Sequence, residues 1–199
     1  MQRWVRIGAF IVCLLPLVWL LHAAAFNRLG PDPAEALMLC TGVWALRMLA
    51  LTLLVSPLRA WTGWSFLLGL RRMLGLYAFF YGCLHFLTFL QFYIGWFPTA
   101  LIEELAERPY IALGFSAWLL MLPLAMTSTR AMQRRLRGNW QRLHRLVYPA
   151  AVIACLHLLW QARSDVGDAL FYIAIFAALL GWRVRRRSLK QRRSVIVRT

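Results

Sequence analysis

The sequence predicts an all-α polytopic membrane protein, a bundle of six transmembrane helices that forms a single domain. Hydrophobic residues make up 61% of the 199 residues, and the mean hydropathy is +0.61. Both values are above those of ordinary soluble domains. Apolar runs about as long as a bilayer crossing recur along the chain, and most charged residues lie between them. These observations together exclude a soluble globular protein.

The six spans are expected at about residues 7–26, 37–56, 73–96, 109–128, 143–162 and 167–183, followed by a basic tail over residues 184–199. The first run follows Arg3 and Arg6, as in a signal peptide. We expect it to stay uncleaved, because it is about twenty residues long and further spans follow. The connections are too short to hold a soluble domain, and no internal repeat is evident.

The charges predict the orientation of the bundle. Nineteen of the 23 Lys and Arg residues lie before span one, between spans two and three, around the link between spans four and five, and in the tail. All seven acidic residues lie on the other side of the membrane in this topology. Because basic loops stay in the cytoplasm, we expect both termini there. The net charge of +16 then indicates contact with anionic membrane lipid, and no nucleic-acid binding.

Two histidines inside apolar runs, His85 and His157, are the main functional candidates. An ionisable side chain in hydrocarbon is costly without a partner, and neutral imidazole is a common haem ligand. At the helical rise, His85 lies roughly 18 Å and His157 roughly 21 Å above the start of its span. Both spans run in the same direction, so the pair is expected at similar depth as axial ligands of one haem. Two unrelated packing histidines are the alternative.

His144 lies thirteen residues before His157, at the predicted cytoplasmic edge. A second haem at this level would need a partner near Arg72, where span three has no histidine. Three interpretations stay open: a ligand of a second haem with an unusual partner, a contact to a flavin or quinone, and an interfacial residue.

Three further residues are candidates for cofactor contact. Gly75 and Gly82 share a face of span three, where glycine would let a flat macrocycle or another helix approach closely. Arg47 lies near mid-membrane, where a cation needs a counter-charge or water. A haem propionate or a flavin phosphate would supply that charge; snorkelling or backbone carbonyl contacts are the alternative.

The chain lacks a nucleotide-binding motif and a C-x-x-C-H motif for covalent haem. Electrons would therefore arrive from a separate donor and leave to a separate acceptor. We expect an electron-transfer subunit of an oxidoreductase system, with no catalytic residue of its own.

Long stretches of the chain resemble the ferric-reductase-like transmembrane group, and within it the haem-binding membrane subunits of bacterial periplasmic methionine sulfoxide reductase systems. These stretches run from Arg71 to Leu76, from Arg108 to Tyr110, from Thr127 to Arg134 and from Trp140 to His144, with Leu84-His85, Val147-Tyr148 and His157 beside them. One departure is Cys40, where some relatives carry a histidine, and this weakens a second haem that uses span two.

The resemblance implies one or two b-type haems, with His85, His144 and His157 at the ligand positions, and an FMN cofactor. It implies electron supply from the quinone pool or from a cytoplasmic flavin reductase. The acceptor would be a periplasmic molybdopterin enzyme that reduces methionine sulfoxide in oxidised proteins, and the location the bacterial inner membrane. Arg71 and Arg72 are candidate FMN contacts from their charge alone.

Two other functions stay open. A stand-alone transmembrane ferric reductase would use the acidic loop with Glu103, Glu104 and Glu107 to attract cations. A non-redox transporter or assembly factor would contain only structural histidines, and it would show no haem absorbance.

Overall fold

The computed structural model describes residues 2–162 and 166–196, which form helices and turns with no strand among them. The helices are α1 Gln2–Ala25, α2 Pro33–Thr62, α3 Leu67–Phe89, α4 Pro98–Glu107, α5 Pro109–Met126, α6 Arg130–Leu136, α7 Gly138–Leu143, α8 Val147–Gln161 and α9 Gly167–Ile196. A π-helical turn, Leu90–Ile94, follows α3, and a 3-10 turn, His144–Leu146, precedes α8. Of the residues used to predict topology, Arg163, Asp165 and Arg198 lie outside the described residues.

Six helical segments are long and apolar enough to cross a membrane: 3–25, 33–62, 67–94, 109–126, 138–161 and 167–189. The prediction of an all-α bundle with six spans is thus confirmed. Several helices extend beyond the predicted spans, because capping residues rather than hydropathy decide where they end. In α2, Asp32 accepts a hydrogen bond from the Glu35 amide at 2.9 Å, and Gly63 ends the helix with φ of 74°. The predicted tail is helical as far as Ile196.

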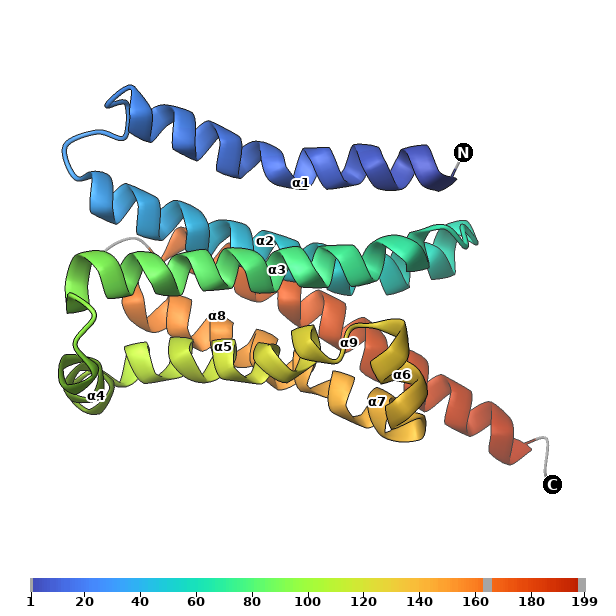
Figure 1. Ribbon diagram of the computed structural model, residues 1–199. Coiled ribbons are helices and arrows are strands. Elements are labelled where there is room, and N and C mark those ends of the chain that lie inside the picture. The colour runs from blue at the N-terminus through green and yellow to red at the C-terminus, as the bar shows by residue number, and fades with distance from the viewer. Residues whose placement is uncertain (1, 163–165, 197–199) are drawn as a thin grey trace.

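The spans run side by side, and the charged segments gather at the two ends of the bundle (Figure 1). We call one the basic end; it holds the N-terminus, the α2–α3 turn, α6, α7 and the last turns of α9. The other, the acidic end, holds the α1–α2 connection and α4. The helix α4 was not predicted from the sequence; it carries Glu103, Glu104 and Glu107 between spans three and four. That the basic end faces the cytoplasm stays a prediction.

Two helical hairpins make up the centre of the bundle: α2 packs along α3, and α5 packs along α8. The side chains of Leu53, Ala78, Ala150 and Ala151 are fully buried between helices. The first span, α1, lies at the edge of the bundle (Figure 1).

Two tyrosine hydroxyls of α3 hold α1 in place. Tyr77 donates to the Phe10 carbonyl oxygen at 3.0 Å, and Tyr81 donates to that of Cys13 at 2.8 Å. Each bond satisfies a hydroxyl that would otherwise be costly in an apolar interior.

Candidate functional site

The structure brings together the two histidines that the sequence analysis paired. His85 on α3 and His157 on α8 have ring centres 6.3 Å apart, with their planes at 71°. Each lies four residues before the last residue of its helix, which is about 6 Å from the acidic end of that helix. The pair therefore lies between the two hairpins, in the half of the bundle nearer the acidic end.

Both imidazoles are oriented by a backbone carbonyl group. The Nδ1 atom of His85 lies 2.9 Å from the Met38 oxygen, and that of His157 lies 2.7 Å from the Tyr110 oxygen. A carbonyl oxygen only accepts, so Nδ1 carries the proton in each ring and Nε2 keeps its lone pair. Metal-binding histidines are commonly oriented in this way by such a second hydrogen bond.

Each ring also lies directly against a glycine of the neighbouring helix. A Cβ atom at Gly42 on α2 would lie 3.0 Å from Nδ1 of His85. A Cβ atom at Gly114 on α5 would lie 2.9 Å from both Nδ1 and Cε1 of His157. Any side chain at these positions would displace the imidazoles, so the two glycines are part of the site.

Gly75 and Gly82, the two glycines predicted from the sequence to contact a cofactor, have other surroundings. A Cβ atom at Gly75 would make an ordinary 3.6 Å contact with Thr52, and one at Gly82 a 3.7 Å contact with Trp118. These are contacts with neighbouring helices, which was the second interpretation of both positions. A role for either glycine against a cofactor stays a prediction.

The two halves of the site repeat each other in sequence register. Half-site one consists of Met38, Gly42 and His85, and half-site two of Tyr110, Gly114 and His157. In each, the residue whose carbonyl oxygen accepts the hydrogen bond lies 47 residues before the histidine and four before the glycine.

Residues 38–85 thus correspond to residues 110–157, and both segments end in Cys-Leu-His. These two segments therefore share a spacing and a terminal Cys-Leu-His sequence, which we call the repeat and which the sequence analysis did not single out. Comparing the two Cys-Leu-His sequences and counting back 43 residues would have found both glycines.

The structure places His144 apart from this pair. His144 lies in the 3-10 turn before α8, stacked on Trp140 with ring centres 3.9 Å apart and planes at 26°. Its Nδ1 atom lies 3.1 Å from the Trp140 carbonyl oxygen. In the register of the repeat, its counterpart is Arg72 rather than a histidine. The fourth histidine of the chain, His22, lies in the last turn of α1, at the acidic end.

Arg47 finds two partners within the chain. Its Nε donates to the Tyr172 hydroxyl at 3.0 Å, and its guanidinium carbon lies 4.7 Å from the centre of the Trp44 ring. These contacts use one of five N–H donors and one face of the group. For the outer nitrogens, the described residues supply no such contact, and the predicted contact to a cofactor anion stays a prediction.

Arginines gather near His144 at the basic end. The charge of Arg71 acts on both His144 and Arg183, whereas Arg72 is exposed. Arg183 is buried, and it donates to the backbone oxygens of Leu179 and Leu53. Of these three arginines, Arg71 is thus the one whose charge acts on His144.

Comparison with known proteins places this site in a family. Residues 41–155, which contain His85 and end two residues before His157, match the ferric reductase like transmembrane component family. The chain is 47% identical over 169 residues to the protein-methionine-sulfoxide reductase heme-binding subunit MsrQ of Xanthomonas campestris pv. campestris (strain 8004), covering 85% of this chain and 78% of that protein. It is 46% identical over 185 residues to the MsrQ subunit of Ralstonia nicotianae, covering 92% and 85%. The chain therefore belongs to the ferric-reductase-like transmembrane family and, within it, to the MsrQ heme-binding subunits.

Proposed function

We propose that this protein is a membrane b-type cytochrome subunit that passes electrons to a periplasmic methionine sulfoxide reductase, the repair enzyme of oxidised proteins. The observation that carries the proposal is the close pair of His85 and His157. The Nδ1–H of each ring donates a hydrogen bond to a backbone carbonyl oxygen. The names of the relatives, as heme-binding subunits of such a reductase, support it.

The spacing of the two rings fits a metal held between them. An imidazole nitrogen bonds a metal such as zinc at about 2 Å, so two rings that share one metal have centres about 6 Å apart. The observed value is 6.3 Å. A bis-histidine site supplies two ligands to the haem iron, and the macrocycle supplies the remaining ligands. A haem bound there supplies one-electron transfer between ferric and ferrous iron.

We propose one haem rather than two. A second bis-histidine site needs a partner for His144, and the register of the repeat puts Arg72 at that position. The stacking of His144 on Trp140, with Arg71 close by, better suits a flat anionic cofactor. We assign this region to FMN, with Arg71 as the contact to its phosphate.

We infer the direction of electron transfer from the positions of the two proposed sites. His144 is thirteen residues from His157, about 20 Å along the helix, towards the basic end. Electrons enter at the basic end from membrane quinol or a cytoplasmic flavin reductase. They leave from His85 and His157 near the acidic end, where a periplasmic molybdopterin-containing catalytic subunit docks. This assignment places the protein in the bacterial inner membrane with both termini in the cytoplasm.

Absorption spectroscopy of the detergent-purified protein, oxidised and dithionite-reduced, tests the haem assignment. We expect a reduced b-type spectrum in the wild type that is absent from both His85→Ala and His157→Ala. A colourless wild type, after expression with ample haem supply, would overturn the assignment and favour the transporter or assembly function.

Kinetics then separates the two redox functions. The reduced protein is mixed either with a purified periplasmic methionine sulfoxide reductase or with a ferric chelate alone. We expect rapid reoxidation only with the reductase. Fast reoxidation by the chelate alone would instead identify a stand-alone ferric reductase, with α4 and its glutamates as the cation-attracting surface.

A further inference from the structure

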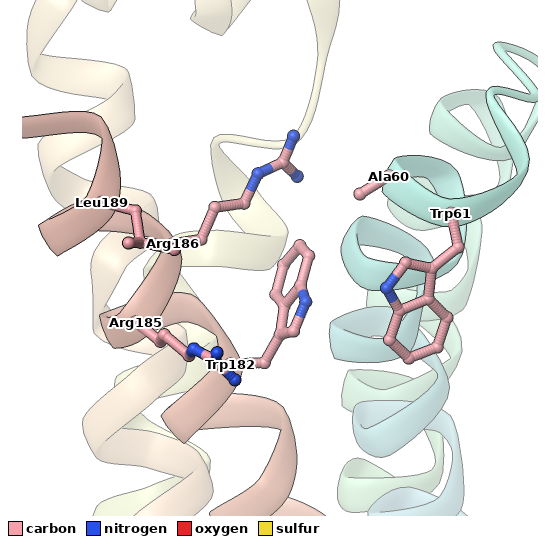
Figure 2. A pocket seen from close by; sticks show the side chains of 6 residues that line it. All are labelled: Ala60, Trp61, Trp182, Arg185, Arg186 and Leu189. Carbon is pink, nitrogen blue, oxygen red and sulfur yellow. The ribbon is translucent and has the colours of Figure 1, made fainter. Parts of the chain in front are cut away.

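A groove opens between the last turn of α2 and the second half of α9, at the basic end. It has a volume of about 330 Å³ and is lined by Ala60, Trp61, Trp182, Arg185, Arg186 and Leu189. Figure 2 shows the two indoles facing each other across it, one from each helix, with both arginines on the α9 side. The ring centres are 6.5 Å apart with planes at 80°, and the guanidinium carbon of Arg186 lies 5.1 Å from the Trp182 ring. The groove therefore combines aromatic walls with two cationic groups.

Among the described residues, the arginines of this groove have no carboxylate partner. No acidic residue follows Asp168, and none lies between Glu35 and Glu103, so the groove side of α9 and the whole α2–α3 turn are free of acids. Among the described residues, the ion pair between Arg108 and Glu104 belongs to the acidic end. The described part of the chain therefore offers no anion to Arg185 and Arg186, which leaves both side chains available to an external one.

The position of the groove indicates which anion that is. Its residues lie at the ends of the segments 33–62 and 167–189, which are long and apolar enough to cross a membrane. Trp side chains at the ends of spans sit at the level of lipid headgroups. The fork of an arginine side chain matches the two oxygens of a phosphate group, and basic pockets between cytoplasmic helix ends suit anionic headgroups.

We propose that this groove binds the headgroup of one anionic phospholipid, such as phosphatidylglycerol. The phosphodiester lies against Arg185 and Arg186, and the glycerol backbone lies against the edge-to-face pair of Trp61 and Trp182. Leu189 and Ala60 border the path of the acyl chains. The site is independent of the haem assignment, because none of its residues contacts either half-site.

Native mass spectrometry of the purified protein, released from micelles doped with equal amounts of phosphatidylglycerol and phosphatidylcholine, tests this proposal. We expect the wild type to retain phosphatidylglycerol preferentially. The double variant Arg185→Gln/Arg186→Gln should lower that retention about 25-fold, since one basic residue near an anionic surface contributes about 1 kcal/mol, or about fivefold.

The matched control is Arg134→Gln/Arg135→Gln on α6, which removes the same charge from exposed positions at the same end of the bundle. This variant should retain the lipid as the wild type does. Equal losses in both variants, or equal retention of the two lipids by the wild type, would overturn the proposal. Release of the lipid by millimolar inorganic phosphate would also overturn it, in favour of a site for free anions.

Trp61→Phe/Trp182→Phe gives a second readout. With phosphatidylglycerol brominated on its acyl chains, quenching of the wild-type tryptophan fluorescence should be saturable. We expect the saturable part to disappear in this variant. Its persistence would place the bound lipid elsewhere.

Discussion

Half-site one and half-site two present the same three groups on helices of different form. In half-site one, His85 stands on α3, a helix without a break from Leu67 to Phe89, and Met38 lies well inside α2. In half-site two, a 3-10 turn precedes α8, and Tyr110 is the second residue of α5. The spacing from carbonyl to glycine to histidine is nevertheless identical. The identical spacing indicates that close contacts around each imidazole, rather than the form of the whole helix, determine where the two histidine side chains lie.

Half-site two is also the tighter of the two. Its hydrogen bond is 2.7 Å long against 2.9 Å, and its glycine approaches the ring more closely. The ring of Tyr110 adds a parallel contact to His157, with centres 6.5 Å apart and planes at 22°. We therefore expect an added methyl group to weaken haem binding more in half-site two than in half-site one. Loss of either histidine should weaken haem binding equally.

Removing a histidine has the largest expected effect. His85→Ala and His157→Ala should each lower haem affinity by at least about 100-fold, since even outer contacts of a metal site are worth 10–100-fold. His144→Ala should leave the haem-to-protein ratio unchanged, because His144 lies about 20 Å from the pair along its helix. The pyridine haemochrome assay measures this ratio. A colourless His144→Ala protein would contradict the assignment of the axial ligands.

Filling the glycine positions should have the next largest effect. Gly114→Ala puts a methyl group 2.9 Å from His157, and overpacking of this kind costs roughly 1–3 kcal/mol, or about fivefold or more in haem affinity. Gly42→Ala, at 3.0 Å from His85, should have a slightly smaller effect. Haem titration of the apoprotein, followed in the Soret band, compares the two.

Gly75→Ala is the matched control for both variants, because its Cβ would make an ordinary 3.6 Å contact. It should bind haem as the wild type does. If Gly75→Ala weakened binding as much as Gly114→Ala, close helix packing in general would explain the glycines, and the repeat would lose its functional meaning.

Neutralising Arg47 should have a moderate effect. If its outer nitrogens hold an anion of the cofactor, Arg47→Gln should lower haem occupancy about fivefold, as expected for a contact worth about 1 kcal/mol. Tyr172→Phe removes only the hydroxyl that accepts from Nε, so its occupancy should stay within about twofold of the wild type. Unchanged occupancy in Arg47→Gln would show that the side chain serves packing against Trp44.

The smallest expected effect is that of a substitution at Pro149, close to the 3-10 turn that precedes α8 in half-site two. Pro149 lacks an amide proton and follows the 3-10 turn His144–Leu146. In the register of the repeat, the corresponding residue of the uninterrupted α3 is Tyr77. It lies eight residues, or about 12 Å, from His157. Pro149→Ala should therefore leave the reduced spectrum and the haem content unchanged, as measured by absorption spectroscopy. A loss of haem comparable to that of Gly114→Ala would show that the break itself orients His157.

Most of the fold was predictable because hydrophobicity and charge act along the sequence. All six spans were found from apolar length, and the structure separates basic from acidic segments as the charges indicated. Helix ends were less predictable, since Asp32 and Gly63 act through local hydrogen bonds and a positive φ rather than through hydropathy. The short helix α4 was missed because its ten residues are too few to produce a span-length pattern.

The sequence by itself determined the helical membrane class, the six spans and the histidines worth pairing, because each depends on the burial of single residues in lipid. Only the tertiary structure decided which glycines contact those histidines and which carbonyl groups orient them. It also decided that Arg47 meets Tyr172 and that Trp61 meets Trp182. Contacts between helices depend on the rotation of each helix about its axis, and that rotation is set by the packing of the whole bundle.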